Sequence, residues 1–355
     1  MNGRSEETNM REKSHDAFIA NAAAGKAGKK YRWLVTGAAG FIGSHLVEAL
    51  LSIGQAVVGL DNFSSGFERN VEAVQTQMSE GAHFEFIRGD IRDKKLCDSA
   101  CEGIDFILHH AAFVSVPASV ANPTAAHANN VEGFFNVLQA AKKRNARRLI
   151  YASSSAVYGN EPNLPLREEA AAANDVLSPY AVTKRIDEFY AETWGSIYGL
   201  ECVGLRYFNV FGPRQDPNGP YAAVIPRWLY ALERDLPVTI YGDGENTRDF
   251  CYVKNVAQAN ILAATVENRQ AVGKVYNIAC GESVTLNELF ELLKRKVAPD
   301  SKCSLVHEAP RAGDITHSAA SIQRARSLLG YTPFYSLEAG LAEMYDKTRK
   351  WEARY

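Results

Sequence analysis

Short apolar runs alternate with longer segments of helical periodicity through the first half of the chain. The apolar runs end at residues 36, 60, 87, 108 and 152, and a glycine or a polar residue follows each of them. Between these runs, segments such as 41–51 place apolar residues three and four positions apart, as helices do. Strands that are apolar throughout need cover on both faces, which is typical of parallel sheets flanked by helices. The pattern predicts an α/β fold with a doubly wound, mostly parallel sheet.

The alternation breaks after a further strand at 201–208. Turn-rich segments follow, and the last third mixes short strands with helices at about 286–296 and 337–351. An apolar run at 275–279 could return to the main sheet, so we expect a smaller α/β domain that interleaves with the larger one. The predicted units are a flexible or loosely helical extension at 1–30, a larger domain at 31–207 with a return segment at about 250–282, and a smaller domain at 208–249 and 283–355.

Composition and charge are those of an ordinary globular protein. Of the 355 residues, 46% are hydrophobic and 23% are charged, and the formal net charge is -2. A near-neutral chain without basic runs argues against nucleic acid as a partner, and no apolar stretch approaches the ~20 residues of a membrane helix. The amino-terminal segment lacks the apolar core of a signal peptide. We therefore expect a cytoplasmic protein with no membrane partner.

The six cysteines show neither a C-x-x-C pair nor a histidine at metal-ligand spacing. They are interpreted as reduced thiols. Cys97 and Cys101 share a helical face, and this arrangement favours helix packing over a metal site. We predict no metal centre.

Two helical segments carry apolar residues on more than one side. The first contains Val131, Phe134, Phe135 and Leu138, and the second, at 179–197, contains Val182, Ile186, Phe189, Tyr190 and Trp194. This surplus of apolar surface suits a helix pair that also packs against another subunit. The sequence thus predicts a homodimer formed through a helix bundle.

Tyr180 and Lys184 stand four residues apart, directly after Ser178 and Pro179. A serine N-cap followed by proline fixes the start of a helix, so the tyrosine and the lysine share a face. An ammonium beside a phenol lowers the pKa of the phenol from about 10, and this makes the phenol a usable base. The spacing also occurs on ordinary surface helices, so the interpretation gains weight only from other features.

A glycine-rich turn lies between the first strand and its helix. Gly37, Gly40 and Gly43 would let the backbone approach a pyrophosphate held at the helix N-terminus. Asp61 closes the second strand, where a carboxylate accepts hydrogen bonds from an adenosine ribose, and Asn62 rather than arginine follows it. This order favours NAD over NADP. The spacing is not G-x-G-x-x-G, so an ordinary strand-to-helix turn is the alternative.

Four segments together resemble the extended short-chain dehydrogenase/reductase family. They are T-G-A-A-G-F-I-G at 36–43, S-S-S-A-V-Y-G at 153–159, S-P-Y-A-V-T-K at 178–184 and R-Y-F-N-V-F-G-P-R at 206–214. The resemblance extends from about residue 31 to the carboxy terminus and is closest to the nucleotide-sugar 4-epimerases, in particular to the subgroup acting on UDP-N-acetylhexosamines and their uronic acids. It implies a Rossmann fold for the larger domain and a tightly bound NAD that is regenerated in each turnover.

The resemblance implies roles for individual residues. Tyr180 would be the base, Lys184 would bind the nicotinamide ribose, and Ser154 would bind the sugar O4, with Ser153 and Ser155 in support. Without Tyr180, a serine run at a strand end more commonly bonds the local backbone. NAD would lie against Gly37, Gly40, Phe41, Ile42, Gly43, Asp61, Asn62, Ser65, Gly66, Asp90, Ile91, Ala111, Ala112, Asn130, Tyr180, Lys184 and Tyr207.

Two positions argue against elimination chemistry. Dehydratases and decarboxylases of the family carry acidic residues just after the catalytic serine or threonine, and this chain has Ser155 and Ala156 there. The implied reaction is oxidation of the sugar at C4, rotation of the 4-keto sugar about its link to the diphosphate, and return of the hydride to the opposite face. Such a reaction needs a cavity that excludes water and leaves the sugar room to turn.

The resemblance also implies a site for a UDP-sugar. Arg248 and Arg311 match positions that clamp the diphosphate, for which guanidinium groups are well suited. Asp314 matches a residue that meets the uridine ribose, Asn209 a residue near the diphosphate and sugar, and Tyr241 one that packs on uracil. Considered alone, each arginine would more commonly be a solvated surface charge.

Ser318 stands where relatives restricted to unacetylated hexoses carry a bulky tyrosine, so it leaves room for a 2-acetamido group. Ser115, Ala223 and Val224 match other positions around the sugar. Val114 replaces a lysine of some hexose epimerases and leaves the choice between a 6-hydroxyl and a 6-carboxylate open. We therefore expect a UDP-GlcNAc/UDP-GalNAc 4-epimerase. The open alternatives are an epimerase of UDP-Glc or UDP-GlcNAcA, a 4-keto-sugar reductase, and a binding protein that senses NAD or nucleotide sugars without turnover.

Overall fold

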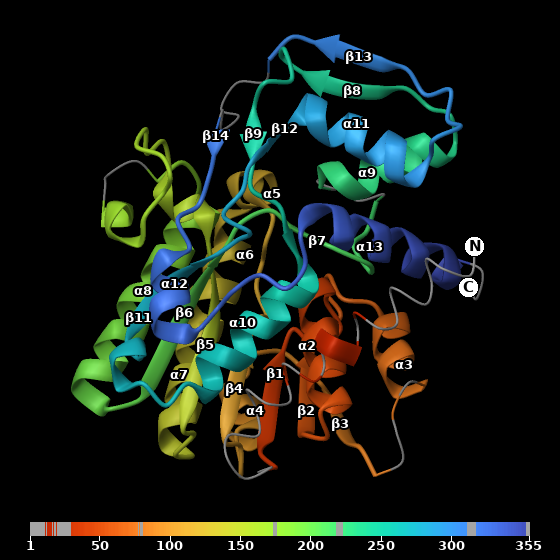
Figure 1. The fold of residues 1–355 in the computed structure, drawn as a ribbon. Coiled ribbons are helices and arrows are strands. Elements are labelled where there is room, and N and C mark those ends of the chain that lie inside the picture. The colour runs from red at the N-terminus through yellow and green to blue at the C-terminus, as the bar shows by residue number, and fades with distance from the viewer. Residues whose placement is uncertain are drawn as a thin grey trace.

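A seven-stranded parallel sheet forms the centre of the protein (Figure 1). The computed structural model describes residues 11, 13–15, 17, 19, 30–76, 78, 81–172, 176–217, 223–310 and 317–352. The strand order is β11-β6-β5-β4-β1-β2-β3, and every neighbouring pair is parallel. The strands are β1 (Arg32–Thr36), β2 (Ala56–Asp61), β3 (His83–Arg88), β4 (Phe106–His109), β5 (Arg148–Ser154), β6 (Glu201–Tyr207) and β11 (Lys274–Ile278).

Helices cover both faces of this sheet. One apolar core joins the strands to α2 (Phe41–Ser52), α10 (Val253–Thr265) and α12 (Gln323–Leu329). A second core, on the other face, joins them to α4 (Lys94–Ala100), α7 (Gly133–Lys143) and α8 (Pro179–Tyr198). The predicted doubly wound α/β fold is therefore confirmed, including the return of the late strand β11 beside β6.

One strand differs from its prediction. The run at 84–87 was expected to be fully buried, but β3 alternates between exposed and half-buried residues. The reason is its place at the edge of the sheet, where β2 is its single partner strand within the part of the chain that the structure describes. An edge strand lacks a neighbour on one side, so its apolar residues mark one covered face rather than two.

Shorter elements connect the layers. They are α3 (Glu68–Thr76), α5 (Val116–Ala121), α6 (Pro123–His127), the π-helical turn Ala128–Glu132, and the 3-10 turns Ser155–Tyr158, Glu168–Ala172 and Arg269–Ala271. Strands β7 (Val210–Phe211) and β10 (Cys251–Tyr252) form a parallel pair between the central sheet and the second lobe.

The second lobe lies at the top of Figure 1 and has its own apolar core. It contains α9 (Val224–Glu233), α11 (Leu286–Val297), α13 (Leu337–Glu352), and the parallel pair β8 (Val238–Tyr241) and β13 (Leu305–Glu308). A small sheet orders β12 (Val284–Thr285), β9 (Thr247–Arg248) and β14 (His317–Ser318). Because the chain enters this lobe, returns for β11 and enters it again, the two lobes interleave.

Part of the amino-terminal extension packs on the body of the protein. Residues 11, 13–15, 17 and 19 are helical. His15 and Ile19 are each only 1% exposed. The ring of His15 contacts Phe334 and Tyr335 edge-on, with centroids 5.2 and 5.3 Å apart.

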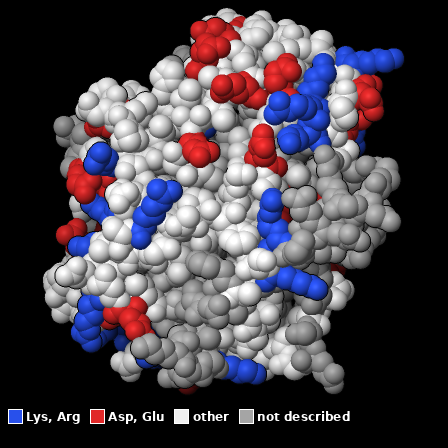
Figure 2. Space-filling model, viewed as in Figure 1, with Lys and Arg blue, Asp and Glu red and all other residues white. Residues whose placement is uncertain are grey.

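The described surface mixes charges of both signs. On the face shown in Figure 2, lysine and arginine side chains are interspersed with aspartate and glutamate. Within the described ranges, none of the helices has the length and apolar character needed to cross a bilayer. The six cysteines are free thiols, and burial raises the pKa of both Cys97 and Cys101 to about 12, so these two pack as neutral groups.

Candidate active site

Helix α8 starts at the predicted residue. Ser178 is its N-cap and accepts a hydrogen bond at Oγ from the backbone N–H of Ala181, while Pro179 occupies the first helical position. A second constraint comes from α5, where Ser119 Oγ accepts from the backbone N–H of Tyr180 at 3.1 Å. Tyr180 is 9% exposed and Lys184 is buried, and both line the same cavity. The cap and the proline thus place the phenol and the ammonium together.

This cavity has a volume of about 460 Å³ and extends along the carboxyl ends of the central strands. Open parallel sheets commonly bind ligands at this edge. Most of the predicted cofactor residues line it: Gly37, Gly40, Phe41, Ile42, Gly43, Asp61, Asn62, Ser65, Ile91, Ala111, Ala112, Tyr180, Lys184 and Tyr207. The catalytic candidate Ser154 and the substrate candidate Asn209 line it as well.

The glycine-rich turn lines the cavity between the ends of β4 and β2. Gly37 has φ +73°, which favours glycine, and its N–H donates to Leu60 O at 2.8 Å. A Cβ on Gly43 would stand 1.9 Å from Gly37 O, so the first turn of α2 sits directly against the turn that precedes it. Only glycine allows this close approach, and it leaves the helix N-terminus open toward the cavity.

Asp61 stands beside the turn at the end of β2. Its Oδ2 accepts from the backbone N–H of Ala39 at 2.9 Å, and its Oδ1 accepts from that of Phe63 at 2.7 Å. Burial raises the pKa of this carboxyl group, and the backbone donors partly offset that effect. The carboxylate is fixed in place and keeps further acceptor capacity for hydroxyl groups in the cavity.

His110 was missed as a site residue by the sequence reasoning, although it follows β4 directly. Its Nε2 lies 2.8 Å from the hydroxyl of Tyr207, and burial lowers its pKa to about 3, so the ring is neutral. Its Nδ1 is buried, and a hydrogen bond with the backbone of Leu108 partly opposes the effect of burial on the pKa. His110 therefore contributes a neutral polar group to the cavity wall.

The three serines at the end of β5 take different positions. Ser154 lines the large cavity and caps the 3-10 turn Ser155–Tyr158, because its Oγ accepts from the N–H of Ala156 at 3.1 Å. Ser153 also borders that cavity, but its Oγ donates to Glu188 Oε1 at 2.7 Å. Ser155 lines a second, smaller cavity of about 210 Å³.

The features on this edge of the sheet fit NAD. The turn offers a tight backbone cradle at a helix N-terminus, Asp61 offers a fixed carboxylate, and His110 offers a neutral polar atom. A model of the family described as "NAD dependent epimerase/dehydratase family" matches residues 33–279. The chain belongs to this family. It is an NAD-dependent epimerase, and NAD is its cofactor.

Similar proteins cover nearly the whole chain. The UDP-glucose 4-epimerase of Mycolicibacterium smegmatis is 36% identical over 315 residues, which span 88% of this chain and 96% of that protein. The UDP-glucuronate 4-epimerase of Thermodesulfobacterium geofontis is 31% identical, with 87% and 93% covered. A solved UDP-N-acetylglucosamine 4-epimerase from Methanobrevibacter ruminantium M1, in complex with UDP-N-acetylmuramic acid, is 39% identical with a TM-score of 0.82, covering 91% of this chain and 99% of that one.

Three predicted cofactor residues of this epimerase do not line the large cavity. Gly66 packs against Ala39, where an added Cβ would come within 2.8 Å. Asp90 accepts from Asn62 Nδ2 at 2.7 Å, and hydrogen bonds from Arg92 lower its pKa to about 2. Asn130 binds the backbone of Phe113 and donates to Thr183 Oγ1. The contacts described for these three residues are therefore made within the protein.

The sugar-end predictions fall in several places. Ser318 lines the small cavity with Ser155, and its strand β14 pairs with β9 at Arg248. Asn209 adopts φ 30° and donates from Nδ2 to Asp249 O at 3.0 Å. Ser115 caps α5, Ala223 and Val224 begin α9, and Tyr241 ends β8. Arg311 and Asp314 lie outside the described residues.

Proposed function

We propose that this protein is a UDP-sugar 4-epimerase whose substrates are UDP-N-acetylhexosamines, and that it interconverts UDP-GlcNAc and UDP-GalNAc. The observation that carries the proposal is that Ser154, Tyr180 and Lys184 line the same cavity as the glycine-rich turn. The relatives named as UDP-sugar 4-epimerases support the reaction type.

Tyr180 is the proposed proton-transfer group at the reacting centre. In the proposed reaction Tyr180 accepts the proton of the sugar 4-hydroxyl and later returns it, while the hydroxyl of Ser154 binds O4. The ammonium of Lys184 stabilises the phenolate. When bound, NAD supplies the hydride acceptor and donor. Because Ser155 and Ala156 follow Ser154, no carboxylate stands there to promote elimination.

The small cavity supports acetylated substrates. It begins at Ser155, directly after Ser154, and is closed by Ser318 and the segment around Gly159 and Leu164. Ser318 is 7% exposed, so a tyrosine in its place would fill this space. A 2-acetamido group on a sugar bound at Ser154 would find room there, whereas a hexose would leave it empty.

The direct test is an equilibration assay. Purified protein is incubated with UDP-GlcNAc without added cofactor, and products are followed by proton NMR beside UDP-Glc and UDP-GlcNAcA. Formation of UDP-GalNAc as the fastest reaction supports the proposal. A faster reaction of UDP-Glc or UDP-GlcNAcA contradicts the substrate, net NAD consumption contradicts an epimerase, and NAD binding without turnover indicates a sensor.

Two variants locate the acetamido group. Ser318→Tyr should lower kcat/KM for UDP-GlcNAc by about 10-fold or more and spare UDP-Glc, because steric exclusion acts only on the larger sugar. Ser318→Ala is the matched control and should retain both activities. If Ser318→Tyr handles UDP-GlcNAc as well as the wild type does, the small cavity does not hold the acetamido group.

We also infer a homodimer formed through α8 and α7. Phe135 packs inside the chain against Tyr190 and Trp194, with ring centroids 5.3 Å apart in each pair. The outer side of α8 still leaves Phe189 55% and Ile197 68% exposed. Exposed apolar side chains on one helix suit a self-complementary interface. A clean monomer in analytical ultracentrifugation at micromolar concentration would contradict it.

A further inference from the structure

Glu188 lies one turn beyond Lys184 on the helix that carries Tyr180. Residues four apart share a helix face, so all three side chains project toward the sheet. The carboxylate of Glu188 is 5% exposed, and Ser153 Oγ donates to its Oε1 at 2.7 Å. Ser153 directly precedes Ser154 on β5. One buried hydrogen bond therefore joins the strand end that carries Ser154 to the helix that carries Tyr180.

Arg206 on β6 completes the coordination of this carboxylate. Its Nε donates to Oε1 and its Nη2 to Oε2 of Glu188, both at 2.8 Å. Arg185 donates to Oε2 from the outer side at 2.6 Å. Burial favours the neutral acid, but the hydrogen bonds and charge of Arg206 outweigh it and lower the pKa of Glu188. The carboxylate is thus ionised and accepts four hydrogen bonds.

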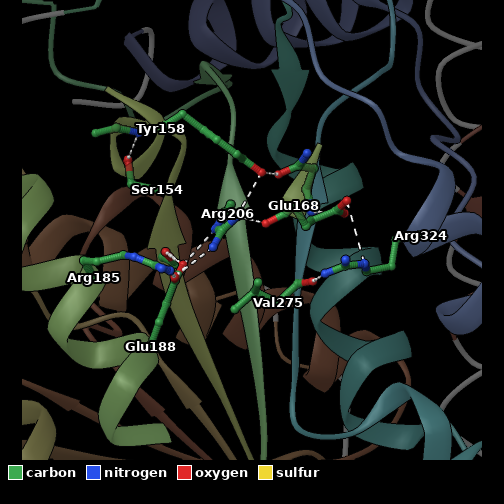
Figure 3. A network of polar contacts seen from close by, with 11 residues as sticks. Ser154, Tyr158, Glu168, Arg185, Glu188, Arg206, Val275 and Arg324 are labelled. Atoms are coloured by element: carbon green, nitrogen blue, oxygen red, sulfur yellow. Dashed lines mark hydrogen bonds and ion pairs between the residues drawn. The ribbon is translucent and has the colours of Figure 1, made fainter. Parts of the chain in front are cut away.

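Arg206 also holds the far end of the serine segment (Figure 3). Its Nη1 donates to the hydroxyl of Tyr158 at 3.0 Å, and that hydroxyl donates to Asn277 Oδ1. Tyr158 ends the 3-10 turn that Ser154 caps. The segment 153–158 is therefore held at both ends by the same buried ion pair, with Ser154 between the two anchors.

We propose that Glu188 is a positioning residue of the epimerase: through Ser153, and through Arg206 and Tyr158, it sets the place of the Ser154 hydroxyl relative to the Tyr180 phenol. This inference rests on the proposed function, in which both groups act on the sugar O4. Reacting groups tolerate little displacement, since an error of about 1 Å can cost about 100-fold in rate. A buried ion pair is by contrast weak evidence of a role in stability, because apolar residues of similar volume often replace such pairs without loss.

Removal of the Ser153 hydroxyl is the mildest test. Ser153→Ala keeps Arg206 on both carboxylate oxygens and frees only the strand end. We expect kcat for the sugar substrate to fall by about 10-fold or more while KM changes by less than about 2-fold, with NAD still bound. Ser153→Thr retains a hydroxyl and should restore most of kcat.

A matched control distinguishes an effect on the position of Ser154 from a general loss of stability. Tyr276→Phe deletes the 2.6 Å hydrogen bond from the buried Tyr276 hydroxyl to Ala271 O, in the same sheet and away from the cavity. The melting temperatures of the two variants should fall by similar amounts, whereas kcat should fall only in Ser153→Ala. An equal loss of kcat in both, or a rise in KM at constant kcat in Ser153→Ala, overturns the proposal.

A double-mutant cycle tests whether Ser153 acts through Glu188. The single variant Glu188→Gln and the double variant with Ser153→Ala should have nearly the same kcat. The reason is that Ser153→Ala removes a hydrogen-bonded link to the carboxylate that Glu188→Gln has already disrupted. Losses of kcat that multiply would mean that Ser153 acts independently and would overturn the inference. Wild-type protein without epimerase activity would instead refute the proposed function, so the two failures are distinguishable.

Discussion

The ammonium Nζ of Lys184 lies 3.3 Å from Asp187 Oδ2, and both side chains are almost completely buried. The other oxygen, Oδ1, has no hydrogen-bond partner among the described residues. Burial disfavours the ionised carboxylate more than Lys184 favours it, so the pKa of Asp187 is raised to about 7. The cation beside Tyr180 therefore has a competing partner whose charge changes near neutral pH.

The first prediction concerns stability against pH. The native protein binds the proton of Asp187 up to about pH 7, whereas an unfolded aspartate releases it near its ordinary value of 3.8. Stability from this group is therefore present below about pH 4 and is lost as the pH rises through 7, by at most about 4 kcal/mol. Asp187→Asn should gain stability relative to the wild type over this range.

Urea unfolding at several pH values from 5 to 8 checks this prediction. The quantity to compare is the difference in unfolding free energy between Asp187→Asn and the wild type, because other titrating groups cancel in it. The other titratable groups near the pair are Tyr151, Glu188 and His109. They are present in both the variant and the wild type. A difference that does not change with pH would show that Asp187 ionises normally.

The second prediction concerns the glycine-rich turn. A Cβ on Gly43 would meet Gly37 O at 1.9 Å and Gly37 C at 2.6 Å, and backbone atoms there cannot move aside. Gly43→Ala should destabilise the protein by about 1–3 kcal/mol and strongly reduce the NAD that copurifies with it. The matched control is Gly195→Ala in α8, where the new Cβ finds only Leu200 O at 3.5 Å.

Gly195→Ala should stabilise the protein slightly, because alanine is favoured over glycine within a helix by up to about 1 kcal/mol. Thermal unfolding and the NAD content per chain, measured by chromatography after acid release, distinguish the two variants. Equal NAD content in both would mean that the close approach at Gly43 has no part in binding.

The third prediction concerns cofactor choice. Both carboxylate oxygens of Asp61 accept backbone N–H groups, from Ala39 and Phe63. In Asp61→Asn the amide NH₂ would face one of these donors, and the negative charge that opposes a 2′-phosphate would be gone. We expect weaker NAD binding and a ratio of Kd for NADP to Kd for NAD that falls by about 10-fold.

Fluorescence titration of cofactor-free protein measures both constants. A second variant, Asp61→Ala, removes the charge without the amide donor and should change the ratio in the same direction. If neither variant changes the ratio, Asp61 does not face the adenosine ribose.

Local signals predicted the elements around the site well. Ser178 and Pro179 act on the residues next to them, so the start of α8 could be placed without knowledge of the fold. The glycine turn is equally local. By contrast, the pairing of β11 with β6 joins segments about seventy residues apart, and only the apolar character of residues 275–279 hinted at it.

The different contacts of the three serines could not be predicted from the sequence. Strand alternation would place Ser153 and Ser155 on one face, but the 3-10 turn begins at Ser155 and ends the alternation. Ser153 bonds Glu188, a partner 35 residues away that only the packing of α8 on β5 brings near. Asp187, three residues after Lys184, could have been noticed from its helical spacing.

The last prediction separates the roles of the two groups proposed to act on the sugar O4. Tyr180→Phe keeps the ring and the backbone hydrogen bond to Ser119, so the fold and NAD content should be unchanged. Without the phenol oxygen the group proposed to take the proton is missing, and kcat should fall by about 100-fold or more. Steady-state kinetics with intact NAD content measures it.

Ser154→Ala should differ from Tyr180→Phe in stability. The Ser154 hydroxyl also caps the turn that starts at Ser155, so its removal should lower the unfolding free energy by about 0.5–2 kcal/mol besides lowering kcat. A second hydroxyl variant, Ser154→Thr, retains both the cap and the donor and should recover part of each. If Tyr180→Phe keeps wild-type kcat, another group carries the proton, and the assignment of the phenol as the base is wrong.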